Sequence, residues 1–439
     1  MRRTQLNRDK IEKMQLWYPL VMLGLGIVQQ MVVQWVVFFY APPTPDMTVY
    51  LSVGHISMAM VIGRIIDGAA DPFVAYFSDR ATFKFGRRRP FMILGFPFLL
   101  LSFILVWRPP VDEVSALNLA WAAVMLSLFF FAYSTIVVPY LAILPELARN
   151  DGERVRLATL QTALYGAGVG LGFIVSTTLS PLIGFPLLSL LVIPLAAFCI
   201  LVPLWSIKED SQGDTAAAPG WRMVFNSLKG DYPFLFWILT QGLVWSSFTI
   251  IVMVIPYLGS AVLGITSLDD VSIPLGIVFL LIAGLGVSAA FHLLNKIGKD
   301  AVYRGSLVAA GFILALFSLQ VFQITPALFL AALVFSLAAG PLVLLFVLPN
   351  AVVAELAEQR RKLKKERWEA LLYAAQGIIV KLSMAGGSAM FGVLLHFGGA
   401  TAEDPRGIYV SFLVSGVLLL IAALVFHKFL KLKEGVEKF

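Results

Sequence analysis

The stretch LSVGHISMAMVIGRIIDGAADPFVAYFS at residues 51–78 decides the fold class of this chain. It is mainly apolar and long enough to cross a bilayer, since a membrane-spanning helix needs about 20 such residues. Arg64, Asp67 and Asp71 interrupt it at spacings of three and four, so all three charges line one helical face. A carboxylate at the bilayer centre costs roughly 2.5 to 3.5 kcal/mol, which favours a functional role for this face.

The composition of the whole chain supports a membrane protein with several spans. Hydrophobic residues make up 59% of the 439 residues and charged residues 13%, and the mean hydropathy is +0.86. Soluble globular chains carry about 25% charged residues. The single cysteine, Cys199, excludes an internal disulfide and a multi-cysteine metal site. We therefore expect an all-α, multi-pass membrane protein.

Apolar segments of spanning length occur in two sets on either side of a polar stretch at 207–231. The first set lies near 17–40, 51–78, 91–108, 117–144, 157–181 and 184–206, and the second near 232–262, 271–293, 302–323, 325–349, 369–396 and 407–430. This pattern predicts twelve transmembrane helices in two six-helix bundles, at 1–206 and 232–439, joined by a cytoplasmic linker at 207–231.

The distribution of basic residues predicts the orientation of these spans. With both termini in the cytoplasm, 29 of the 33 Lys and Arg residues fall in cytoplasmic segments, as membrane proteins prefer. The net charge of +7 is thus a topology signal and does not indicate a nucleic-acid partner. The long apolar run after the basic N-terminus also argues against a cleaved secretory signal. We expect a multi-pass protein of the plasma (inner) membrane.

The charges inside the predicted spans balance one another. Asp67 and Asp71 lie roughly 11 to 17 Å above the cytoplasmic end of their span, close to the middle of the membrane. The other charges well inside the predicted spans are Arg64 and Lys381, so the four sum to zero. We hypothesise that a monovalent cation competes with Arg64 or Lys381 for the acids and thereby drives a conformational change. The alternative is a purely structural network of salt bridges.

Several segments resemble the glycoside-pentoside-hexuronide:cation symporter family of the major facilitator superfamily, in particular its melibiose permease-like branch. They are GRIIDGAADPF at 63–73, SDRATFKFGRRRPFMILG at 78–95, VVPYLAILPEL at 137–147 and ERWEALLYAAQGIIVK at 366–381. The resemblance implies the twelve-helix major facilitator fold, cation-driven symport and alternating access. It also implies that Asp67 and Asp71 bind Na⁺ or H⁺ with help from the hydroxyl of Ser134.

The sequence departs from the melibiose permease pattern at the sugar-binding acids. The first span offers Gln29, Gln30 and Gln34 in place of an acid, and Val137 stands at the position of the acid in the fourth span. The loop after residue 78 also resembles that of sucrose/proton symporters. The fourth-span VPY and Lys381 resemble sodium-dependent lysophosphatidylcholine transporters. The expected solute is a small sugar or glycoside, with a lysophospholipid or other amphipathic solute as the alternative and a passive channel as a third reading.

Further residues are predicted to line the solute path or a cytoplasmic gate. The solute candidates are polar or aromatic residues within spans, namely Gln29, Gln34, Trp35, Tyr133, Gln161, Tyr165, Trp245 and Gln376. The gate candidates are Asp79, Arg80, Gly86, Arg87, Arg88 and Arg89, whose charges could pair with acids after the fourth span. Simple anchoring of the loop by its positive charge is the alternative.

An enzyme is not expected, because the four histidines fall on different spans and form no local metal motif. We expect no cofactor beyond the coupling Na⁺ or H⁺, and no metal other than that Na⁺. The expected partners are a small-molecule solute, the coupling cation and membrane lipid, for a protein that is a monomer.

Overall fold

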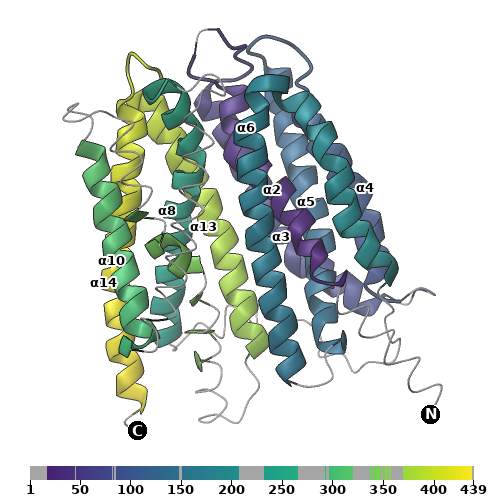
Figure 1. Cartoon of the computed structure of the whole chain (residues 1–439), viewed down its shortest axis with the longest axis vertical. Helices are drawn as coiled ribbons and strands as arrows, with labels where there is room; N and C mark the ends of the chain where they lie inside the picture. Colours follow the sequence, from purple (N-terminus) through teal and green to yellow (C-terminus); the bar gives the residue numbers. More distant parts are fainter. Residues whose placement is uncertain are drawn as a thin grey trace. The chain divides into compact units, whose positions relative to one another are not determined.

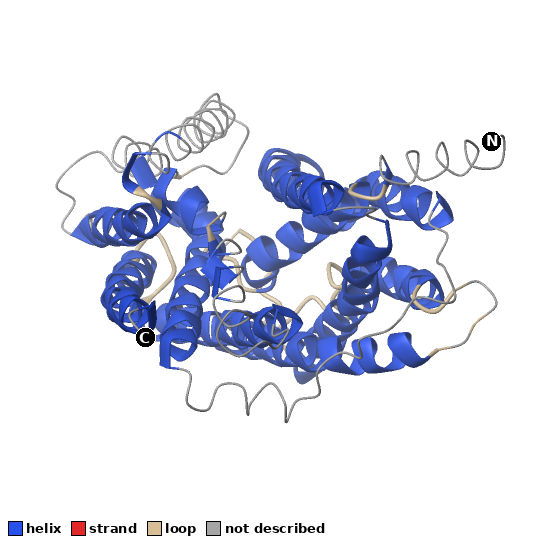
Figure 2. Cartoon of the chain, turned by 90° about the horizontal axis from the view of Figure 1, so that it is seen from below, coloured by secondary structure: helices blue, strands red, loops and turns tan. Residues whose placement is uncertain are grey.

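The regular elements of the part of the chain described in the computed structural model are helices (Figures 1 and 2). The described residues are 17–44, 46–81, 83, 86–147, 151–206, 232–264, 292, 296–319, 337–338, 340–346, 348–349, 352–353, 355–356 and 369–437. The elements are α2 (Leu20–Tyr40), α3 (Val53–Arg80), α4 (Arg89–Leu105), α5 (Ala116–Leu147), α6 (Asp151–Ser206), α8 (Tyr232–Tyr257), the π-helix η1 (Leu258–Val262), α10 (Lys299–Phe317), α13 (Glu369–Gly398) and α14 (Arg406–Glu437). The all-α prediction is confirmed for these residues.

Eight helices among the described residues are long and apolar enough to cross a membrane. The shorter apolar helix α4, of 17 residues, falls on the predicted third span. Nearly all of the predicted span 271–293, most of 325–349 and the linker 207–231 lie outside the described residues. The count of twelve helices and the division at the linker therefore stay predictions.

Helix α6 contains two of the predicted spans in one element of 56 residues. Gly184 interrupts it with φ 71° and ψ 159°, a conformation that glycine adopts far more readily than other residues. The interruption falls at the border between the predicted spans 157–181 and 184–206. Since Pro181 and Pro186 flank this glycine, both the backbone and the prolines mark a bend between two membrane crossings.

The chain forms two compact units that do not follow a single cut in the sequence. Unit 1 comprises residues 1–39 and 62–218, and unit 2 comprises residues 40–61 and 219–439. Residues 40–61, which the sequence analysis places in the N-terminal bundle, thus group with unit 2. Helix α3 begins in unit 2 and continues in unit 1 without a break in its helical structure.

In unit 1, glycines of α6 allow α2 to approach its backbone. A Cβ on Gly168 would overlap the carbonyl oxygen of Leu23, and one on Gly172 would lie 2.8 Å from that of Ile27. Gly168 and Gly172 are four residues apart, as in the small-xxx-small pattern of tightly packed membrane helices. On another side of α2, a Cβ on Gly24 would lie 2.9 Å from Cys199, beyond the bend in α6. Both arms of α6 therefore contact α2.

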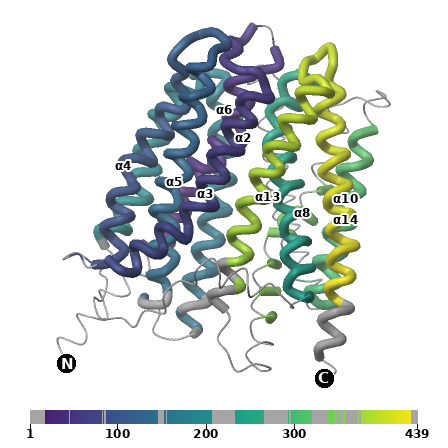
Figure 3. The backbone as a smooth tube through the Cα atoms, turned by 180° about the vertical axis from the view of Figure 1, so that it is seen from behind, coloured from purple at the N-terminus to yellow at the C-terminus, as the bar shows by residue number. Residues whose placement is uncertain are grey.

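In unit 2, α8 packs against α13 and α14, and α10 packs against α14, as the view in Figure 3 also shows. Two neighbouring glycines in the later part of α13 differ in their surroundings. A Cβ on Gly387 would lie 2.6 Å from the carbonyl oxygen of Ser246 in α8, whereas one on Gly386 would meet nothing within 4 Å. The first glycine thus permits helix contact.

Candidate cation and solute site

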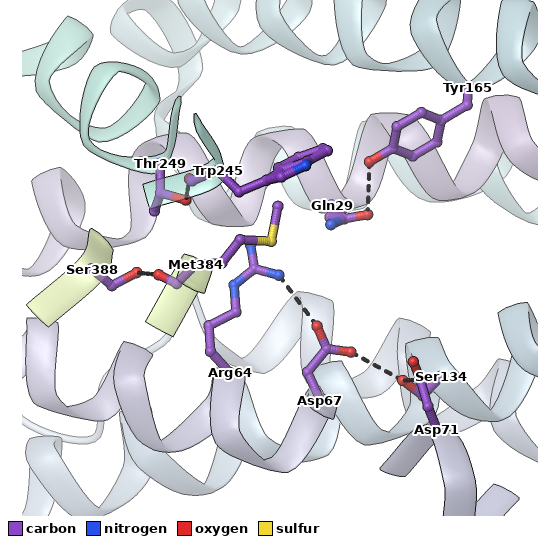
Figure 4. A network of polar contacts seen from close by, with 10 residues as sticks. All are labelled: Gln29, Arg64, Asp67, Asp71, Ser134, Tyr165, Trp245, Thr249, Met384 and Ser388. Carbon is purple, nitrogen blue, oxygen red and sulfur yellow. Dashed lines mark hydrogen bonds and ion pairs between the residues drawn. The ribbon is translucent and has the colours of Figure 1, made fainter. Parts of the chain in front are cut away.

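Helix α3 presents its two carboxylates, Asp67 and Asp71, to a serine on α5 (Figure 4). Nη1 of Arg64 lies 3.3 Å from Oδ2 of Asp67, as the spacing of three residues predicts. The hydroxyl oxygen of Ser134 lies 3.0 Å from Oδ1 of Asp67 and 2.8 Å from Oδ1 of Asp71. Arg64, Asp67 and Ser134 are buried, and Asp71 is half-buried. The structure thus brings together four of the predicted residues.

The contacts of Ser134 gather three oxygen atoms around one hydroxyl proton. A serine hydroxyl donates one hydrogen bond, so it can serve only one of the two carboxylate oxygens at a time. The other carboxylate oxygen then faces a lone pair of the hydroxyl. A proton or a small cation shared among these oxygens would remove that repulsion, because oxygen atoms are the ligands that hard cations prefer.

The guanidinium of Arg64 is fixed by a phenyl ring that the sequence analysis did not single out. Its central carbon lies 4.3 Å from the centroid of Phe130, within the range of a cation–π interaction. Phe130 and Ser134 are four residues apart on α5 and therefore lie on the same face. That spacing places Phe130 beside Ser134, but the sequence carries no signal for the register between α3 and α5 that brings the ring to Arg64.

One polar contact in unit 1 joins two of the predicted solute residues. The hydroxyl of Tyr165 donates a hydrogen bond of 3.2 Å to Oε1 of Gln29, as Figure 4 shows. This contact connects α2 and α6. A third candidate, Tyr133, is buried on α5 next to Ser134.

Three other predicted solute residues in unit 1 are held by helix packing. Nε1 of Trp35 donates a hydrogen bond of 2.7 Å to Ser176, and Gln161 donates one of 3.0 Å to the hydroxyl of Tyr18. Gln34 is 1% exposed, and its Oε1 accepts a hydrogen bond of 2.9 Å from Gln30. Their role in solute binding stays a prediction, because each already has a partner within unit 1.

The remaining predicted residues lie in unit 2. Gln376 accepts a hydrogen bond of 2.8 Å from Nε1 of Trp237. Trp245 packs edge-on against Phe346, with ring centroids 4.8 Å apart. Lys381 is half-buried on α13. The expected competition between Lys381 and the bound cation stays a prediction.

Two of the predicted gate residues, Arg88 and Asp79, form an ion pair in unit 1 that, with the bond from Arg88 to Ala142, is called the clamp below. Nε and Nη2 of Arg88 lie 3.2 and 3.0 Å from Oδ1 of Asp79, and Nη1 donates a bond of 2.6 Å to the carbonyl oxygen of Ala142 on α5. Arg80 stacks on the ring of Tyr76 at 3.6 Å. The clamp joins the end of α3 to α5 around the loop that carries the predicted gate.

The other predicted gate residues are next to Arg88 in the sequence. Gly86 has φ 104° within the loop, and Arg87 lies half-buried beside it. Arg89 begins α4. The side chains of Glu146 and Asp151, two of the expected acidic partners after α5, lie outside the described residues. A gating role of this loop stays a prediction.

We expect Arg88→Ala to destabilise the protein more than Arg406→Ala. The Arg88–Asp79 pair has side chains only 9% and 14% exposed, whereas the Arg406–Asp404 pair is 71% and 41% exposed. Breaking a buried pair costs about 3 kcal/mol, while exposed pairs contribute at most about 1 kcal/mol. Thermal unfolding of the purified protein in detergent measures the difference. Equal melting temperatures for the two variants would contradict a structural role for the clamp.

Comparison with known proteins places the chain in a family. Residues 18–434 match the family described as MFS/sugar transport protein, so the chain belongs to that family. This confirms the resemblance to symporters of the major facilitator superfamily and makes the chain an integral, multi-pass membrane transporter. The family is one of transporters rather than enzymes, and its members act on small-molecule solutes.

Curated relatives match shorter parts of the chain. It is 34% identical over 120 residues to the uncharacterized symporter YnaJ of Bacillus subtilis, covering 27% of this chain and 25% of YnaJ. It is 29% identical to the isoprimeverose transporter of Lactiplantibacillus pentosus, covering 31% and 29%. It is 27% identical to the sodium-dependent lysophosphatidylcholine symporter 1 of Gallus gallus, covering 27% and 22%. Each match thus spans less than a third of the relative.

Among solved structures, the nucleoside transporter NupG has the same fold. The two superpose with a TM-score of 0.64 at 15% identity, over 95% of this chain and 99% of NupG. This likeness shows the major facilitator fold alone, since so low an identity carries no information on the solute.

Proposed function

We propose that this protein is a cation-coupled symporter of a small solute that works by alternating access. The observation that carries the proposal is the cluster of Asp67, Asp71 and Ser134, in which three oxygen atoms share one hydroxyl proton. Ionisable residues within spans are rare and usually functional, and this cluster has the ligand chemistry of Na⁺ or H⁺. Relatives named as symporters support the same class.

In this proposal the bound cation changes the balance of charge within the spans. Asp67 also contacts Arg64, so a cation among the carboxylates weakens the hold of the acid on the arginine. A ligand shifts a conformational equilibrium only through different interactions with the two states. We infer that release of Arg64 is that difference. No cofactor other than the coupling ion is required.

The proposed solute is a sugar or glycoside. The family description and the name of the isoprimeverose transporter favour this class. A lysophospholipid is the second candidate, because one relative is named as a lysophosphatidylcholine symporter. The proposal includes twelve helices in two bundles, both termini in the cytoplasm, the plasma (inner) membrane as the location, surrounding lipid as a partner, and a monomeric state.

Uptake into proteoliposomes tests the proposal. The purified protein is reconstituted and given a panel of sugars, glycosides and lysophospholipids, with an imposed inward gradient of Na⁺ or of H⁺. We expect at least one solute to accumulate above its external concentration under one of the gradients. An ionophore that dissipates the gradient should abolish the accumulation. Flux that only equilibrates the solute and ignores both gradients would identify a passive pathway and overturn the proposal.

A further inference from the structure

The buried guanidinium of Arg64 has an edge whose two donors find no acceptor among the residues that the structure describes. Arg64 is 1% exposed, and its Nη1 contacts Asp67, whereas Nε and Nη2 form no hydrogen bond with any residue in the described ranges. Buried N–H groups are nearly always paired, and leaving one unpaired is costly, above all for a charged group within a membrane. An acceptor that binds both N–H groups would therefore be strongly favoured at this edge.

The two donors have the geometry of a recognition fork. Nε and Nη2 lie on the same edge of the planar guanidinium, so their N–H bonds point in parallel toward one side. This arrangement matches the two oxygens of a carboxylate or phosphate, which accept both bonds at once. Phe130 covers a face of the group at 4.3 Å and Asp67 holds Nη1, so the fork is oriented in advance.

We propose that Arg64 is the oxyanion receptor of the transported solute, with Nε and Nη2 donating paired hydrogen bonds to a carboxylate or phosphate group. The proposal rests on the symport function proposed above and narrows its solute to an anionic class. Arg64 then has two roles at different edges of its guanidinium. Nη1 pairs with Asp67, and Nε and Nη2 bind the solute.

Matched pairs of solutes test this proposal on the full chain in proteoliposomes. Methyl glucuronide and methyl glucoside differ in a carboxylate, and a lysophospholipid and its monoacylglycerol differ in the phosphate headgroup. We expect gradient-driven uptake of the acidic member of one pair to exceed that of its neutral partner at least about tenfold. The pair that shows the preference distinguishes a sugar carboxylate from a lipid phosphate. No preference in either pair would overturn the proposal.

The variant Arg64→Lys tests the fork itself, with Arg406→Lys as the control at an exposed arginine. Lysine keeps the charge but lacks two parallel donors. We expect Arg64→Lys to lower uptake of the preferred acid at least about tenfold, and Arg406→Lys to leave it unchanged. Unchanged uptake by Arg64→Lys would overturn the proposal even if transport remains gradient-driven. Gradient-independent uptake in the wild type would instead overturn the symport function. The comparison of acidic and neutral solutes uses only the wild-type protein, so it tests the proposal even if the Arg64→Lys variant fails to fold.

Discussion

Replacing Asp67 with asparagine is expected to abolish gradient-driven accumulation of solute. Asparagine has nearly the same shape, so it can still accept a hydrogen bond from Ser134, but it removes the negative charge that faces Nη1 of Arg64 at 3.3 Å. The bound cation then loses one of its two charged ligands, and Arg64 loses the partner whose release we propose as the coupling step. Initial rates of uptake under an imposed gradient should fall at least about tenfold.

The control for this experiment is Asp112→Asn, which makes the same chemical change at an exposed position outside α3 and α5. It should accumulate solute as the wild type does. A second comparison is Ser134→Ala, which removes the shared hydroxyl and leaves both carboxylates. We expect it to weaken the dependence on the cation by a few-fold only. Normal accumulation by Asp67→Asn would show that the charges of α3 form a structural network instead.

The Gly168→Ala substitution is expected to destabilise unit 1, whereas the same substitution at Gly166 is not. The new Cβ would overlap the backbone carbonyl of Leu23, which cannot move without shifting α2. Overpacking of this kind typically costs about 1 to 3 kcal/mol, and the helix contact offers no flexible side chain to absorb the strain. We expect a lower melting temperature in detergent, together with reduced transport because α2 carries Gln29.

Gly166→Ala provides the matched control on the same helix. A Cβ at Gly166 would meet nothing within 4 Å, and alanine favours a helix over glycine by about 1 kcal/mol. This variant should therefore be as stable as the wild type or more stable. If both alanine variants melted at the same temperature, the close approach of α2 and α6 would not exist in the folded protein.

Much of the fold could be predicted because membrane spans have a strong local signal. A span must satisfy its backbone hydrogen bonds internally and be apolar over about 20 residues, so length and hydropathy alone locate it. The predicted segments 17–40, 51–78 and 117–144 agree with α2, α3 and α5 to within a few residues. The bend at Gly184 falls at the border between the predicted segments 157–181 and 184–206.

The candidate site was predictable only in part, because sequence spacing places residues on one helix face but not opposite another helix. The spacing of Arg64, Asp67 and Asp71 identified the charged face, and the family resemblance supplied Ser134. The stacking of Phe130 on Arg64 depends on the register between α3 and α5, which no local pattern encodes. Trp35 and Gln161 show the converse, since each polar group is occupied by a packing partner that the sequence did not reveal.

The continuity of α3 has a mechanical consequence for the charged cluster. Between Ser57 and Asp67 the helix contains no proline, and the two residues are separated by about 15 Å of helical rise. Ser57 packs against Gly392 of α13 within unit 2, whereas Asp67 belongs to unit 1. An uninterrupted α-helix resists twisting about its axis, so Ser57 and Asp67 rotate together when the helix turns. A turn of Asp67 toward or away from Ser134 on α5 is thereby also a turn of Ser57 against α13.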